Sequence, residues 1–121
     1  MKTKYIILLG GLIVSATAFL SLRPVPIPEE QDCLSLKGTV TAIYEGGVKD
    51  VVFKLDGKEQ SFYINRGLER GLILNDLKTD LIGQEILIKY PDHWTPLDPG
   101  NSVVHISKIE HAGQTVFTEM K

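Results

Sequence analysis

The chain has 121 residues, which is enough for one domain once its uncharged N-terminal stretch is set aside. Lys2 and Lys4 are the only charges before Arg23, so the rest of the chain holds 11 basic and 15 acidic side chains, a formal net charge of −4. This acidic balance lacks the basic surface that phosphate backbones require, and we expect no nucleic-acid partner.

Residues 5–22 form an uncharged, mostly apolar run behind Lys2 and Lys4. The pattern is typical of a signal anchor or a signal peptide, and either one sends the following domain across the membrane. As a helix the run would extend about 27 Å, close to the thickness of a bilayer core. We favour an anchor, which predicts a single-pass protein of the cell membrane with a cytoplasmic N-terminus and an extracytoplasmic domain. Cleavage near Ala18, at a small-x-small motif, is the alternative and would give a secreted or periplasmic protein.

Residues 23–33 predict a linker between this leader, residues 1–22, and a domain that spans residues 34–121. Prolines at every second position from 24 to 28 fix φ and remove amide donors, so the linker should be stiff and extended. Glu29 and Glu30 fall in this linker, where we expect nothing to shift their pKa. Cys33 is the only cysteine, so the domain has no intrachain disulfide and depends on its core.

The domain begins with patterns of period two, which predict strands. The first strand should cover residues 36–44, and Gly38 inside it indicates a bulge or a sharp bend. On strict alternation, the residues that share one face of this strand are Leu36, Gly38, Val40, Ala42 and Tyr44.

Residues 51–64 predict a β-hairpin that turns at Asp56-Gly57, because a tight turn needs positive φ and these two residues tolerate it. A two-residue turn would place Lys54 opposite Glu59 and Val51 opposite Phe62, whereas a three-residue turn would shift this register. Tyr63 should face outward. The hairpin residues expected in the core are Val51, Phe53, Leu55, Phe62 and Ile64.

After the hairpin the apolar spacing becomes helical. Leu74, Leu77 and Leu81 fall on one helical face, with Asn75 as the expected cap and Gly83 as the end. Strands are then expected at residues 86–90, 103–109 and 115–118, with a long proline-rich loop over residues 91–101.

This order of elements resembles the OB-fold, a small Greek-key barrel, here with five to six strands and one short helix between strands three and four. The resemblance covers residues 34–119. Two local segments, Tyr63 to Glu69 and His93 to Pro99, are similar to segments of small exported bacterial proteins, and a periplasmic bacterial OB-fold is the nearest named group. The likeness carries over no catalytic residue.

The resemblance implies that a ligand meets strands two and three and the loops at residues 45–50 and 91–101. Trp94, with His93 beside it, is a candidate stacking surface for a protein, peptide or glycan. The structural alternative, which the packing tendency of a sole tryptophan favours, is that Trp94 covers the end of the barrel. Tyr63 lies on the adjoining face, where Asn65 and Arg66 are candidates to hold an anionic group. Alternatively, Arg66 is an exposed charge.

Other chemistry finds little support in the sequence. His93, His105 and His111 lack the spacing of a zinc site, so we expect no metal and no cofactor. No nucleophile elbow or phosphate-binding glycine loop is present, so we expect a binding module and not an enzyme. The alternatives are a structural or assembly membrane protein, with contacts at a sheet edge or at residues 5–22, and, least favoured, a nucleic-acid-binding OB domain.

Overall fold

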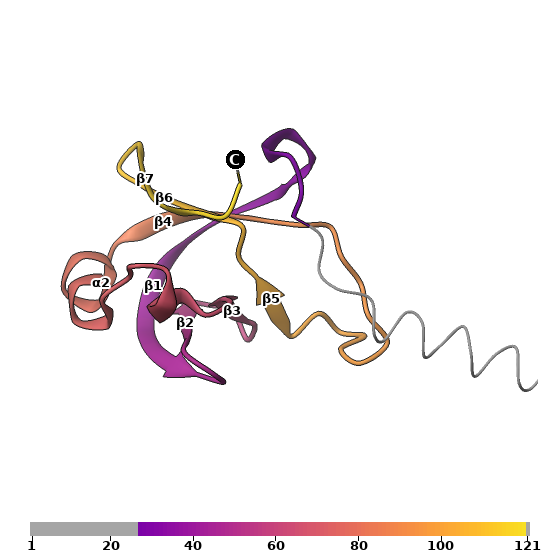
Figure 1. The fold of residues 1–121 in the computed structure, drawn as a ribbon, viewed down its shortest axis with the longest axis horizontal. Coiled ribbons are helices and arrows are strands. Elements are labelled where there is room, and N and C mark those ends of the chain that lie inside the picture. The colour runs from indigo at the N-terminus through magenta and orange to yellow at the C-terminus, as the bar shows by residue number, and fades with distance from the viewer. Residues whose placement is uncertain (1–26, 121) are drawn as a thin grey trace, which may run out of the picture.

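The computed structural model describes residues 27–120, which form a mainly β domain (Figure 1). The predicted leader and residues 23–26 of the predicted linker lie outside the described residues. Within residues 27–120, no helix has the length and apolar character needed to cross a membrane. The elements in chain order are η1 (Glu30–Asp32), β1 (Leu34–Gly46), β2 (Asp50–Leu55), β3 (Ser61–Ile64), η2 (Gly67–Glu69), α2 (Leu74–Leu81), β4 (Glu85–Tyr90), β5 (Val103–His105), β6 (Lys108–His111) and β7 (Gln114–Thr118).

The strands form one sheet in the order β5-β3-β2-β1-β4-β6-β7. The long β1 joins the two parts of the sheet, because its first half pairs with β4 and its second half with β2 (Figure 1). The predicted strand over residues 103–109 is divided into β5 and β6. The mainly β class is therefore confirmed. For the described part of the chain, strand pairing ends at β5 and β7 and does not close the sheet into a barrel.

A bulge in β1 overturns the strict alternation predicted for this strand. The register with β2 shifts between Val40 and Ala42, so Thr41 is an extra residue. Val40 and Ile43 both lie in the core as a result, and Tyr44 turns outward with 42% of its surface exposed. Gly38 does not form this bulge. It allows close packing instead, because a Cβ there would lie 2.8 Å from Leu55 Cδ1.

The predicted register of the β2–β3 hairpin is wrong by two residues. Lys54 pairs with Ser61, and Val51 pairs with Ile64. The Lys54 ammonium donates hydrogen bonds to the carbonyls of Glu59 and Gln60, at 2.8 and 3.1 Å, and these contacts accompany a longer turn. Because a shift of two preserves the faces of a strand, every predicted core residue of the hairpin is still buried.

The helix α2 lies between β3 and β4, as predicted, with Leu77 and Leu81 buried against the sheet. Asn75 is not its cap, because the helix begins after Ile73 and no side chain caps it. Gly83 follows the end of the helix with a φ of +85° and donates its amide to the Val40 carbonyl. The core on which α2 packs consists of Val40, Ile43, Val51, Phe53, Leu55, Phe62, Ile64, Leu77, Leu81, Ile86, Ile88, Val104, Ile106, Ile109 and Phe117.

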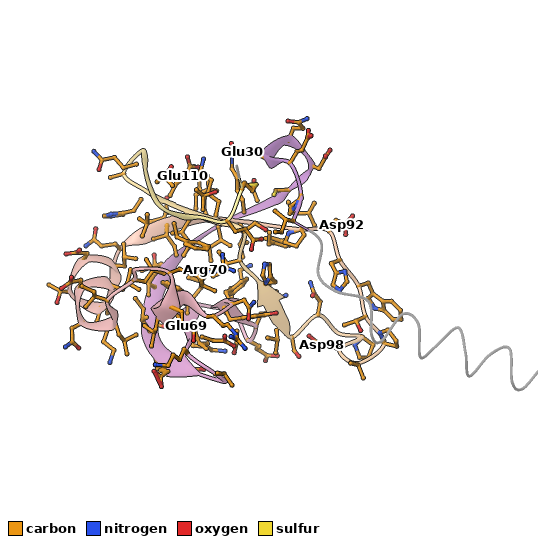
Figure 2. The ribbon with its side chains drawn as sticks, viewed as in Figure 1. Glu30, Glu69, Arg70, Asp92, Asp98 and Glu110 are labelled. Atoms are coloured by element: carbon orange, nitrogen blue, oxygen red, sulfur yellow. The ribbon has the colours of Figure 1, made fainter. Side chains whose placement is uncertain are left out.

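The end of the predicted linker packs on the sheet. Glu30 in η1 accepts hydrogen bonds from Lys89 on β4 at 2.6 Å and from Lys108 on β6 at 2.7 Å. The pKa of Glu30 is lowered to about 2, mainly by Lys108 and then by Lys89. The prediction of an unshifted pKa is therefore wrong for Glu30. Figure 2 shows Glu30 on the same side of the molecule as β6 and β7. Nearby, Cys33 is half-buried, with its Sγ 3.8 Å from Met120 Sδ.

Candidate functional site

Four residues stand opposite one another across four neighbouring strands and form a row on the outer face of the sheet. Tyr44 on β1 pairs with Val52 on β2, Val52 pairs with Tyr63 on β3, and Tyr63 pairs with His105 on β5. Their alternate neighbours, such as Phe62, point into the core, so the row faces away from it. We call Tyr44, Val52, Tyr63 and His105 the Tyr63 row.

Two hollows lie along the Tyr63 row and share Tyr63 and Val103 in their walls. The larger hollow has a volume of about 460 Å³ and is also lined by Tyr44, Val52 and Asp50. The smaller hollow, of about 90 Å³, lies toward the loop over residues 91–101, and its lining residues include Pro91, His93, Thr95, Asn101 and His105. The outer face of β1, β2, β3 and β5 is therefore hollowed on both sides of one tyrosine.

His105 is held from behind by a buried polar cluster. Its Nε2 lies 2.8 and 3.0 Å from the two carboxylate oxygens of Glu119, and its ring meets Tyr63 edge to face, with centroids 5.4 Å apart. Ser107, which is fully buried, donates its hydroxyl to the same Glu119 carboxylate at 2.8 Å. The cluster fixes the imidazole that forms one end of the Tyr63 row.

Carboxylates shape the electrostatics of the Tyr63 row. Burial raises the pKa of Tyr63, and the negative charges of Asp50 and Glu119 raise it further. Burial also acts to raise the pKa of Glu119, but the hydrogen bonds and charge of His105, together with Ser107, outweigh burial and lower that pKa below its usual range. Glu119 is therefore ionised at neutral pH, and Tyr63 keeps its proton.

The loop over residues 91–101 is organised by Asp98. Its Oδ1 accepts hydrogen bonds from the Ser102 hydroxyl at 2.6 Å and the Ser102 amide at 3.0 Å, and its Oδ2 accepts one from the Val103 amide at 2.9 Å. These contacts, the hydroxyl first, lower the pKa of Asp98. Figure 2 marks Asp92 and Asp98 on this loop, which extends from the sheet on the side away from α2.

The sequence-predicted site residues divide between the two hollows and the surface beside them. Tyr63 and Asn65 line the larger hollow, and Tyr63 and His93 line the smaller one. Trp94 is 50% exposed, and its indole Nε1 donates to the Pro99 carbonyl at 3.2 Å. Arg66 is exposed and pairs with Glu69 at 3.5 Å. Neither Trp94 nor Arg66 is a wall residue of the two hollows described here.

Sequence reasoning missed three contributors to this surface. Tyr44 lies on the outer face of the sheet because of the bulge at Thr41. The sequence signal for that bulge was the pair of apolar residues Val40 and Ile43, which are three positions apart. Asp50 lies in the predicted ligand loop at residues 45–50 but was not singled out. Glu119 gave no local signal, because its contacts with His105 and Ser107 are tertiary.

The polar cluster behind the Tyr63 row is buried. Ser107 is fully buried and donates a hydrogen bond to Glu119, whose side chain is also buried, so the Ser107 hydroxyl is not exposed in the two hollows. Among residues 27–120, no three histidine, cysteine, aspartate or glutamate side chains converge in a group able to hold a metal ion. The larger hollow is lined by aromatic rings, apolar side chains and a carboxylate, which are groups that can contact a ligand.

The fold and this surface define a mainly β domain with a hollowed outer sheet face. Comparison with protein-family models and with curated proteins finds no match.

Proposed function

We propose that this chain is a membrane-tethered, extracytoplasmic binding module built on an OB-like barrel, and that its protein, peptide or glycan partner binds across the Tyr63 row. The observation that carries the proposal is the pair of hollows on either side of Tyr63, which lie over β2, β3 and the loops beside them. Tyrosine and tryptophan rings that are partly exposed on a rigid sheet are typical of binding surfaces, since they give a large contact area at little entropic cost.

The course of the chain between β5 and β6 supports the OB-like barrel. Ile106 donates its amide to the Tyr63 carbonyl on β3, and the next residue, Ser107, donates its amide to the Lys89 carbonyl on β4, both at 2.8 Å. One stretch, residues 103–111, therefore contacts β3 at its start and β4 at its end. Because β1 pairs with both β2 and β4, this stretch is a second connection between the two parts of the sheet, which supports an OB-like arrangement.

The proposed localisation rests on residues 5–22, because an apolar run that follows two lysines is typical of a membrane anchor. An anchored domain holds its partner near the membrane. The competing class, an assembly protein without a ligand site, would make its contacts through residues 5–22 or along the exposed edge at β7.

Position-specific photo-crosslinking of the full chain in intact membranes tests the proposal. Benzoylphenylalanine is placed at Val103, which lines both hollows and is 53% exposed, or at Thr115 on β7, or at Leu12 in the leader. We expect a discrete adduct from Val103 that is absent from Thr115.

Adducts from Leu12 or Thr115 without one from Val103 would favour assembly and contradict the proposed site. Adducts at none of the three positions would also count against a binding module. A Val103 adduct that persists when Tyr63 is changed to leucine would show that the Tyr63 row is not part of the contact.

A further inference from the structure

The larger hollow has the composition of a site for a positively charged group. Two tyrosines, Tyr44 and Tyr63, stand on either side of Val52, and Asp50 is at the rim. Aromatic faces attract cations through their quadrupole, and a carboxylate beside them adds direct charge attraction.

The two carboxylate oxygens of Asp50 have different neighbours. Its Oδ1 accepts a hydrogen bond from the Arg66 amide at 2.8 Å, which fixes the carboxylate in place. Its Oδ2 faces Gly47, where a Cβ would lie only 2.7 Å away. Gly47 has no side chain to stand against this oxygen, and Asp50 and Gly47 both line the hollow.

The hollow is also polar along its length. Lys54 lies at the opposite end, where its ammonium is 3.4 Å from Ser61 Oγ and is held by the carbonyls of Glu59 and Gln60. Asp50 and Lys54 are on the same face of β2 and four residues apart, or about 13 Å at the rise of a strand. The hollow therefore has a carboxylate in its wall beside Gly47, whereas the Lys54 ammonium near Ser61 is already bonded to three acceptors.

We propose that the larger hollow binds a lysine or arginine side chain of an extended peptide, with the cation between Tyr44 and Tyr63 and Asp50 as its counter-ion. This inference rests on the function proposed above and names the chemistry of the partner. The net charge of −4 from Arg23 onward favours the approach of a basic partner over that of an acidic one.

The test uses the full chain in detergent micelles, with amide chemical shifts followed by NMR during titration. The probe is a blocked pentapeptide with lysine at its centre and alanine elsewhere, and the matched control peptide has norleucine in place of lysine. We expect the lysine peptide to shift the amides of residues 44, 52 and 63 and to bind about two- to fivefold more tightly than the norleucine peptide. Raising the salt concentration should narrow this difference.

Asp50→Asn removes the charge but keeps an oxygen for the Arg66 amide. The substitution should weaken binding of the lysine peptide about two- to fivefold and leave the affinity for the norleucine peptide unchanged. Asp56→Asn, in the exposed turn between β2 and β3, is the matched control and should change neither affinity. If Asp50→Asn disturbs the spectrum of the unliganded protein, the comparison of the two peptides on the unmodified chain, with its salt dependence, decides the question.

A neutral glycan, chitotriose, separates this inference from the proposed function. Equal binding of the two peptides, or binding of chitotriose alone at residues 44, 52 and 63, would overturn the cationic occupant and leave the proposed binding surface standing. Shifts from none of the three probes would also overturn the inference, and the proposed function would then be judged by crosslinking at Val103.

Discussion

At the residue scale, Glu119 is the clearest case of a side chain whose role depends on its partners. Only 4% of its side chain is exposed, and its carboxylate accepts from Ser107 and contacts the imidazole of His105. A buried carboxylate is costly unless such groups surround it. Glu119 thus holds His105, and through it the end of the Tyr63 row, at the expense of a charge placed inside the domain.

Glu119→Gln tests this role. Glutamine has the same shape, but it has no charge and only one side-chain oxygen to accept hydrogen bonds from Ser107 and His105. We therefore expect the free energy of unfolding at pH 7 to fall by about 1–3 kcal/mol. Urea unfolding of the full chain measures the change. Glu45→Gln, on the exposed surface of β1, is the matched control and should leave stability within about 0.5 kcal/mol of the unmodified chain. Equal effects of the two substitutions would contradict the role given to Glu119.

The pH dependence of the stability that Glu119 contributes gives a second prediction. Because the pKa of Glu119 is lowered from an ordinary value of 4.5, the stability it contributes is fully present above that value and is lost as the pH falls through the lowered pKa. The difference in stability between the unmodified chain and Glu119→Gln should therefore shrink below about pH 4.5. Unfolding measured across pH 3–7 checks this sign, and a difference that widens with acid would refute it.

At the element scale, close packing between segments decides how the strands and turns fit together. Gly67 at the start of η2 is buried, and a Cβ there would lie 2.8 Å from Val51 Cγ2 and 3.1 Å from Ile64 Cγ2. Both neighbours are β-branched core residues on adjacent strands and have little freedom to move. The glycine therefore lets η2 close over the ends of β2 and β3, beside Asp50 and the larger hollow.

Gly67→Ala should destabilise the domain by about 1–3 kcal/mol, because the added methyl group overpacks a core that is already full. Gly100→Ala is the control, since a Cβ at Gly100 meets nothing within 4 Å, and its effect should stay within about 0.5 kcal/mol. Thermal or urea unfolding distinguishes the two. Tolerance of alanine at both positions would show that η2 is not packed as described.

Glu30 gives the prediction for the attachment of η1 to the sheet. Its carboxylate should titrate at about 2 in a carbon-13 NMR experiment, because Lys108 and Lys89 stabilise the charged form. In the Lys108→Gln variant the pKa should move back toward 4.5. Since the pKa is depressed, the contribution of Glu30 to stability is present above pH 4.5 and declines as the pH falls toward 2. An unshifted titration would mean that η1 is not held by these lysines in solution.

The sequence predicted the kinds of elements better than their alignment. Period-two patterns identified β2, β3 and β4, and leucine spacing identified α2, because burial of one face imposes those periods directly. The hairpin register differs because the turn is longer than two residues, and the face of Tyr44 differs because of a one-residue bulge. Of the candidate site, Tyr63 followed from alternation alone, whereas Glu119 depends on contacts between distant parts of the chain that no local pattern contains.

At the scale of the whole molecule, the proposed binding surface and the attachment of η1 lie on different parts of the sheet. α2 covers one side of the domain, and the loop over residues 91–101 extends on the other (Figure 1). The Tyr63 row lies on the outer face of β1, β2, β3 and β5, and η1 is tied to β4 and β6 through Glu30. The proposed binding surface and the attachment of the linker thus lie on different strands, so a partner can bind without displacing η1.

We propose that the Tyr63 row is accessible to solvent and lies on the outer side of the membrane. The test uses the substitution Val103→Cys in a chain whose Cys33 is changed to serine. Intact cells are treated with a membrane-impermeant maleimide, which reports both the accessibility of the surface and its side of the membrane. Ile88→Cys, fully buried, is the unlabelled control. We predict labelling at Val103 in intact cells, to the same extent as in permeabilised ones. Labelling at Val103 only after permeabilisation, or at neither stage, would contradict the account.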